Sequence, residues 1–364
     1  MCTTICNYFN FFNQVDLRAQ MHRKEIIMKN NNFYSINAAA NNNSENNGGM
    51  IMMNATIKTM DVFAQVVKEA VEASLGDGYE VSIHEVLKNN DTHLTGLTIR
   101  TEESNIAPTI YLEGSFERYK AGDAAVPVIV SEILSVYESH KTTMSFDASL
   151  VTDFSACKER ICYKLVNADR NRELLADAPH IIVCDDLAVL FYILVSNDGE
   201  GTATITVRNN MTDLWGVEED ELFKIALLNT QRLFRGSVMS MASVMMDLLS
   251  DRMDDEYSSE FFDMVVSEDM VPMYVCSNSQ KVNGAGVILY KDLLKQFAEK
   301  TGSDFYILPS SIHETLLVPV SDQMEVEALR SMVREVNATQ VAPEEVLSDN
   351  VYIYRREDDK ISLA

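Results

Sequence analysis

The sequence predicts an α+β fold with mainly antiparallel sheets and packed helices. Strand-like runs occur in pairs joined by short turns, as in Tyr79–Leu87 and Leu94–Arg100, and such pairs predict hairpins. Helical patterns follow these pairs rather than alternating with single strands, which disfavours a doubly wound parallel sheet. Hydrophobic residues make up 46% of the 364 residues, enough for the core of one large domain or two ordinary ones.

Residues 1–53 differ in composition from the rest of the chain. They are rich in asparagine, most densely in Asn41–Gly49. A polar tract of this kind buries too little apolar surface to offset the entropy of ordering, so we expect a disordered leader. Two origins remain open: a flexible tail, or an over-extended reading frame whose true start is Met50, Met52 or Met53.

The folded part begins with a helix, because apolar residues recur at helical spacing over Thr59–Leu75. Lys88–Asp91 is a turn-forming cluster that joins the two strands of the hairpin. The next run, Ile106–Leu112, contains Pro108, which predicts a strand at a sheet edge. A second amphipathic helix is expected at Val128–Tyr137.

The rest of the chain mixes strands and helices in the same manner. The expected strands are Ile161–Val166, His180–Cys184, Leu187–Val195, Thr202–Arg208, Met273–Cys276, Gly286–Tyr290, Asp304–Leu308, Thr315–Val320 and Val351–Arg355. The expected helices are Asn171–Ala176, Glu218–Arg232, Ser237–Leu249, Lys291–Lys300 and Glu325–Val336.

The acidic, polar stretch Asp251–Glu260 predicts a boundary between two α+β lobes, residues 54–250 and 260–364. The tetrapeptide Ser-Ile-His-Glu occurs at Ser82–Glu85 and again at Ser311–Glu314. Two similar lobes would produce such a repeat, and so would chance.

Charge excludes some classes of partner. The chain has 30 Lys and Arg residues against 55 Asp and Glu residues, a net charge of -25. Residues 1–60 hold five basic and three acidic residues, so the remainder carries -27. Such a surface repels phosphate backbones and anionic membranes. Solubility and a basic protein partner are the two interpretations left.

No sequence feature places the chain in a membrane or outside the cell. The most apolar run, Leu187–Val195, is half of what a spanning helix needs. The six cysteines form no C-x-x-C pair, and the chain is too long for a disulfide-stapled fold. We expect free thiols in a soluble, cytoplasmic protein.

Two tempting motifs fail on context. Ser155–Lys158, Lys300–Gly302 and Ser348–Asn350 match the three elements of serine β-lactamases, but their order along the chain is wrong. Lys300–Gly302 also ends a helix, with Gly302 in the usual glycine position after it. Asn283–Gly286 lacks the third glycine of a dinucleotide loop, and a hairpin turn is expected there.

Polar residues from three distant segments form the candidate site. They are Lys88, Asn89, Asn90, His180, Asp185, Asp186, Ser310, Ser311, His313 and Glu314. Asp185 and Asp186 follow a strand and are a weak candidate for holding Mg²⁺. His313 and Glu314 are adjacent on an extended segment and point to opposite faces, so they cannot act as one dyad. No cofactor can be inferred.

Many short motifs are spread over roughly residues 58–362. They are Leu87–Asn90, Thr95–Leu97, Pro108–Leu112, Asn167–Asn171, Leu174–Leu175, Pro179–His180, Asp186–Ala188, Asn229–Thr230, Gly284–Ala285, Leu308–Glu314 and Val336–Asn337. Together they resemble a domain-of-unknown-function family common in anaerobic Firmicutes, and the resemblance implies members that are often carried on mobile elements. The resemblance implies one continuous folded unit and brings no activity, substrate or catalytic residues.

Two functions are therefore compatible with the sequence. The first is a non-enzymatic interaction or regulatory protein whose acidic surface mimics a polyanion and occupies a basic protein. The second is an enzyme or binding protein for a small molecule or metal, with its site built from the three polar segments.

Overall fold

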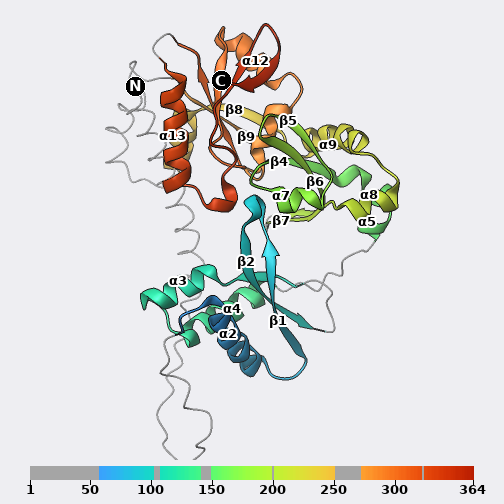
Figure 1. The fold of residues 1–364 in the computed structure, drawn as a ribbon, viewed down its shortest axis with the longest axis vertical. Coiled ribbons are helices and arrows are strands. Elements are labelled where there is room, and N and C mark those ends of the chain that lie inside the picture. Colours follow the sequence, from blue (N-terminus) through green and yellow to red (C-terminus); the bar gives the residue numbers. More distant parts are fainter. Residues whose placement is uncertain (1–56, 102–106, 141–148, 199–200, 251–271, 322–323) are drawn as a thin grey trace, which may run out of the picture. The chain divides into compact units, whose positions relative to one another are not determined.

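The computed structural model describes residues 57–101, 107–140, 149–198, 201–250, 272–321 and 324–364 (Figure 1). The expected leader, residues 1–53, lies outside these ranges. Three mainly antiparallel sheets with packed helices confirm the predicted α+β class. Contacts divide the chain into two compact units. The large unit contains Asn89–Asp91 and Ser149–Ala364, and the small unit contains the residues that flank Asn89–Asp91, up to Ala148.

The small unit packs three helices against a three-stranded sheet. Its helices are α2 (Met60–Leu75), α3 (Glu113–Ala121) and α4 (Val126–His140), and its strands are β1 (Tyr79–Leu87), β2 (His93–Thr101) and β3 (Thr109–Tyr111). Strands β1 and β2 pair antiparallel from Tyr79 with Thr101, which confirms the predicted hairpin. Strand β3 lies at a sheet edge, as Pro108 predicted. Side chains from all three helices, including Phe63 and Ile129, form one core with Leu97 and Ile99.

The first sheet of the large unit is antiparallel. Its strands are β4 (Ile161–Asn167), β5 (His180–Cys184), β6 (Leu187–Asp198) and β7 (Gly201–Thr206), with β4 on one side of β6 and β5 and β7 on the other. Helix α9 (Glu219–Leu233) packs on this sheet and satisfies the free edge of β4. The Asn229 amide donates to the Ile161 carbonyl at 2.9 Å, and the Tyr163 N–H donates to the Thr230 hydroxyl at 3.0 Å. These bonds cover a strand edge that would otherwise be open to other chains.

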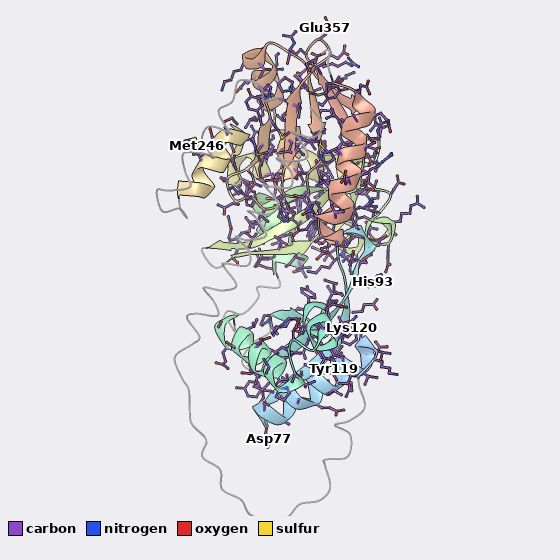
Figure 2. All side chains as sticks on the ribbon, turned by 90° about the vertical axis from the view of Figure 1, so that its left-hand side faces the viewer. Asp77, His93, Tyr119, Lys120, Met246 and Glu357 are labelled. Carbon is purple, nitrogen blue, oxygen red and sulfur yellow. The ribbon has the colours of Figure 1, made fainter. Side chains whose placement is uncertain are left out.

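The second sheet of the large unit has six strands. In chain order they are β8 (Gly236–Ser240), β9 (Tyr274–Asn278), β10 (Phe305–Leu308), β11 (Thr315–Pro319), β12 (Tyr352–Arg355) and β13 (Lys360–Leu363), arranged as β13-β12-β10-β11-β9-β8. Helices α10 (Met241–Ser250) and α13 (Val326–Thr339) cover one face. Helix α12 (Leu293–Thr301) packs on the other face, in a core shared with the first sheet. Met246 of α10, labelled in Figure 2, is 47% exposed.

Two predicted elements were wrong. The expected helix Ser237–Leu249 is split: its first residues form edge strand β8, and the helix begins at Met241. Pairing with β9 makes the first part of this apolar stretch a strand, and local periodicity contains no information about that partner. The expected strand Gly286–Tyr290 lies instead in a 3₁₀ helix, η3 (Gly284–Leu289). Asn283–Gly286 therefore opens this helix and is not a hairpin turn.

Neighbouring atoms leave no room for a Cβ at two positions of η3, which explains why glycine occupies them. A Cβ on Gly284 would lie 2.2 Å from the Ser277 hydroxyl oxygen and 2.3 Å from the His313 carbonyl oxygen. A Cβ on Gly286 would lie 3.0 Å from the ring of Tyr163, whose hydroxyl donates to the Gly286 carbonyl at 2.7 Å.

Helix α3 and strand β13 were missed by the sequence patterns.

The compact units do not coincide with the two lobes expected from the sequence. Asp251–Glu260 lies outside the described residues, but the strands on either side of it, β8 and β9, pair with each other. One hydrophobic cluster contains residues from both expected lobes, such as Phe191 and Phe305. The two Ser-Ile-His-Glu copies also differ in structure, since Ser82–Glu85 lies in β1 and Ser311–Glu314 in a loop before β11.

No helix among the described residues combines the length and the apolar character that crossing a bilayer requires.

Candidate functional site

Buried asparagines are the most distinctive polar feature of the molecule. The buried asparagines of the described residues are Asn89, Asn167, Asn171, Asn229, Asn278 and Asn337. Each buried amide needs hydrogen-bond partners, because leaving such a group unpaired costs about 1–3 kcal/mol. The hydrogen-bond partners of these asparagines show which distant segments are held together.

Asn90 and Asn171 hold each other through a reciprocal pair of bonds. The Asn90 N–H donates to Oδ1 of Asn171 at 2.8 Å, and Nδ2 of Asn171 donates to Oδ1 of Asn90 at 3.0 Å. Nδ2 of Asn90 also donates to the carbonyls of Pro343 and Val346, both at 2.7 Å. Those carbonyls lie in and just after the short helix η4 (Pro343–Glu345). Asn90 has a φ of 60°, a conformation that asparagine adopts more readily than most residues.

Asp91 acts as a helix cap supplied from a distant segment. Its carboxylate accepts the N–H groups of Glu173 at 2.9 Å and Leu174 at 3.2 Å, in the first turn of α7 (Arg172–Ala176). Asn171, which precedes α7, makes no capping bond because its side chain bonds to Asn90 and to the Asn167 carbonyl. Asn89–Asp91 thus belongs to the large unit through side-chain bonds.

Asp186 is saturated by donors. It accepts Nδ2 of Asn167 at 2.9 Å, the Ser348 hydroxyl at 2.7 Å and the Tyr352 hydroxyl at 2.5 Å. Burial, with the bond to Asp186, raises the pKa of Tyr352 well above its usual range, so this phenol stays a donor. Asp185 is exposed in the β5–β6 turn, with a φ of 40°.

No metal ligand set is present in the described parts of the chain. There, no group of three or more His, Cys, Asp or Glu side chains is arranged to hold an ion. Among these residues, the structure therefore adds no further ligand to Asp185 and Asp186, the weak candidates for holding Mg²⁺.

His313 has partners at both ring nitrogens. The Asn283 N–H donates to Nδ1 at 3.2 Å, and Nε2 lies 3.6 Å from Oε1 of Glu345. Hydrogen bonding to His313 lowers the pKa of Glu345. The Ser311 hydroxyl accepts the backbone N–H of His313 at 3.0 Å, and the Ser311 N–H donates to the Glu314 carbonyl at 3.2 Å. His313 is therefore not placed to activate a serine, because both of its ring nitrogens face other groups.

Hydrogen bonds bring several of the predicted site residues into one network. Asn90 connects through Asn171 and Asn167 to Asp186. Asn89 donates to the Glu344 carbonyl at 2.8 Å, next to the Glu345 that faces His313.

Other predicted residues lie apart from this network. His180 bonds only locally, to the Ala178 carbonyl at 2.9 Å, and lies at the opposite end of β5 from Asp185. Lys88 belongs to the small unit, where its Nζ lies 4.3 Å from the centroid of the Tyr111 ring. Ser310 is buried.

One atom of the network lacks a partner. Asn89 is 8% exposed, and its Oδ1 accepts no hydrogen bond from the described residues. Its Nδ2 must face the Glu344 carbonyl, so the amide cannot be turned over to relieve this. This free acceptor would suit a donor from an added group.

The cysteine thiols of the described residues are not suited to act as nucleophiles. All cysteines in the described residues are free. Burial raises the pKa of Cys157, Cys162 and Cys184 to about 11 and that of Cys276 to about 12. These thiols are protonated at neutral pH, whereas a reactive cysteine needs its thiolate.

An acidic segment between two helices was not singled out by the sequence patterns. It contains Asp213 at the end of α8 (Asn209–Trp215) and Glu218–Glu221 at the start of α9. All five carboxylates are exposed, and none forms an ion pair within the described part of the chain. Residues 209–223 contain five acidic residues and no basic one, and this was the available signal.

The fold and the polar network define an α+β protein with an acidic surface and buried amides that bond to its own backbone. The chain belongs to the family of unknown function DUF5688, which matches residues 60–356. Comparisons with curated proteins and with solved structures gave no match.

Proposed function

We propose that this protein is a non-enzymatic interaction protein that occupies a basic surface of another protein. The observation that carries the proposal is its charge: -27 beyond residue 60. Surfaces of opposite charge attract partners over the screening length and accelerate association.

The interactions that the polar side chains already make support the same proposal. Asp186 accepts three hydrogen bonds, His313 has partners at both nitrogens, and the described thiols are protonated. A catalytic site needs a nucleophile or base that is free to meet a substrate. The carboxylates of the α8–α9 segment, by contrast, have no ion pair among the described residues and can meet a cationic partner.

A nucleic-acid partner is disfavoured by the same charge, since affinity for phosphates comes from Lys and Arg. The free thiols of the described residues fit a reducing compartment, and we propose a cytoplasmic location. The association with mobile elements of anaerobic Firmicutes that the sequence resemblance implies would suit a protein that acts by occupying another protein.

The proposal can be tested by sedimentation of the full chain with a folded basic protein that has its own chromophore, such as cytochrome c. At about 50 mM salt the chromophore should sediment faster when the chain is present, and it should return to its free rate at about 500 mM salt, where screening is strong. An unchanged sedimentation rate at the lower salt concentration contradicts the proposal.

A binding site for a small molecule is the second candidate, and the unpaired Oδ1 of Asn89 favours it. The ligand would bring a hydrogen-bond donor to Asn89, next to Asn90. A thermal-shift screen with divalent metals, nucleotides and metabolites tests it, because a ligand of the folded state raises the melting temperature. A shift that Asn89→Leu abolishes supports the site, and a flat response across the panel removes it.

A further inference from the structure

Strand β1 leaves one edge of the small unit's sheet open (Figure 1). It pairs with β2 over all nine of its residues, from Tyr79 with Thr101 to Leu87 with His93, without a bulge. On its other side it has no neighbouring strand, and no backbone group of β1 bonds to a described residue there. Strand β1 therefore presents a long, regular row of backbone donors and acceptors.

The hydrogen bonds of the hairpin show which residues of β1 face this open edge. The Lys88 N–H donates to the Thr92 carbonyl at 2.8 Å, and these two residues continue the register of the hairpin. Bonded and non-bonded residue pairs alternate along an antiparallel ladder, so the even-numbered residues of β1 bond to β2. The odd-numbered residues point their N–H and C=O groups toward the open edge; they are Tyr79, Val81, Ile83, Glu85 and Leu87.

The edge of β1 lacks the protection that other strand edges of this protein have. Proteins protect such edges with prolines, lysines, bulges, short strands or covering elements. Strand β3, at the other edge of the same sheet, has three residues and follows Pro108. Side chains of α9 cover the edge of β4 in the large unit. Strand β1 contains no proline or lysine, and an open edge of this length suits the addition of another strand.

The sequence of β1 is complementary to itself. When two copies of β1 pair antiparallel about Ile83, every residue of both strands has a partner. Ile83 then lies opposite Ile83, Val81 lies opposite Glu85, and Tyr79 lies opposite Leu87. The odd-numbered residues exchange hydrogen bonds in this register, and the side chains that pack on the core of the small unit stay on one face of the joined sheet.

Charge also favours this register. Glu80, His84 and Lys88 lie on the same face, because side chains alternate along a strand. In the paired strands Glu80 lies opposite Val86 and diagonal to both His84 and Lys88 of the other copy, a separation of about 7–8 Å that long side chains can span. No two like charges lie opposite each other, whereas a register centred on Glu85 would oppose two carboxylates.

We infer that β1 is the interface of a homodimer, in which the β1 strands of two copies pair antiparallel about Ile83 and join the two small-unit sheets into one. A twofold axis makes the interface isologous, so one self-complementary edge is sufficient. The inference goes beyond the proposed function and does not depend on it, because backbone hydrogen bonds hold this interface and charge holds the basic partner.

The test is sedimentation equilibrium of the full chain in about 0.5 M salt, where the repulsion between two acidic chains is screened. Glu85→Pro removes an N–H group that faces the open edge and leaves the bonds between β1 and β2 in place. Glu85→Ala is the matched control, because it removes the same carboxylate and keeps the N–H group. Far-UV circular dichroism checks that each variant has folded.

A second set of variants tests the register without removing any backbone donor. Glu80→Lys would lie diagonal to His84 and Lys88 of the other copy, so it should weaken the dimer at about 0.15 M salt, where charges at this separation still interact. Adding Lys88→Glu restores opposite charges across the twofold axis and should recover the dimer. The double variant has the net charge of the unmodified chain, so recovery reports the pairing of these two positions.

The unmodified chain and Glu85→Ala should both sediment with twice the mass of one chain at about 100 µM. Glu85→Pro should dimerise about tenfold more weakly or not at all, because the twofold axis makes each lost bond count twice. An unmodified chain with the mass of one chain at about 100 µM would overturn the inference. Equal dimerisation of Glu85→Pro and Glu85→Ala, or a double variant no stronger than Glu80→Lys, would also overturn it.

Discussion

Replacing Asn171 with alanine should destabilise the large unit more than any exposed substitution. Asn171 is fully buried, and its side chain makes three hydrogen bonds. Alanine would leave the Asn167 carbonyl, the Asn90 N–H and Oδ1 of Asn90 without those partners. Each abandoned group costs about 1–3 kcal/mol when it is buried, and less where water can reach it.

The magnitude follows from which of these groups water can reach. The bond to the Asn167 carbonyl is buried, whereas both bonds to Asn90 are partly buried. We therefore expect a loss of about 2–4 kcal/mol in the free energy of unfolding, less than the sum of three full penalties.

The assay is urea unfolding followed by tryptophan fluorescence. Trp215 is the only tryptophan and lies in the large unit, where its indole N–H donates to the Val151 carbonyl at 2.9 Å. Asn210→Ala is the matched control, because Asn210 is exposed on α8 and should change stability by no more than about 0.5 kcal/mol. If Asn171→Ala costs no more than this control, the buried network does not stabilise the large unit as argued.

Three further substitutions test other parts of the account by the same unfolding assay. Gly284→Ala should cost more than about 2 kcal/mol because its Cβ would meet a carbonyl oxygen at 2.3 Å; an unchanged midpoint would show that the loop yields freely. Thr230→Val keeps the shape but removes the acceptor of the buried Tyr163 N–H, and should cost about 1–3 kcal/mol; a neutral result would mean that the edge of β4 needs no cover. His313 lowers the pKa of Glu345, so the bond between them stabilises the fold above the ordinary carboxyl pKa of 4.5 and is lost as the pH falls through the lowered value. Glu345→Gln should therefore be less stable than the unmodified chain at about pH 6, and the difference should shrink as the pH falls below the ordinary carboxyl pKa; a pH-independent difference would refute the pairing.

Local patterns identified the elements whose character is local. The hairpin β1–β2 and helix α9 have clear periodicity and turn residues, and both form where expected. Strand β8 and η3 differ because distant partners decide them: β9 pairs with β8, and Tyr163 packs on Gly286. A local sequence pattern contains no information about a partner that lies tens of residues away or more.

The polar network shows the same limit. Asn89, Asn90 and Asp186 could be selected as polar residues beside strands, but their roles depend on where the chain returns. Asn90 bonds to Asn171, 81 residues away, and to Pro343, 253 residues away. Asparagine is a turn former in sequence, and nothing local distinguishes an exposed turn from one that is anchored in a core.

The proposed function requires that the acidic surface bind a basic partner through its charge. The most direct measurement is the affinity of the full chain for labelled poly-L-lysine between about 50 and 200 mM salt, because screening by salt weakens any attraction between opposite charges. The affinity should fall steadily as the salt concentration rises, and labelled poly-L-glutamate should not bind at any concentration. An affinity for poly-L-lysine that is independent of salt, or no binding at about 50 mM salt, would contradict it.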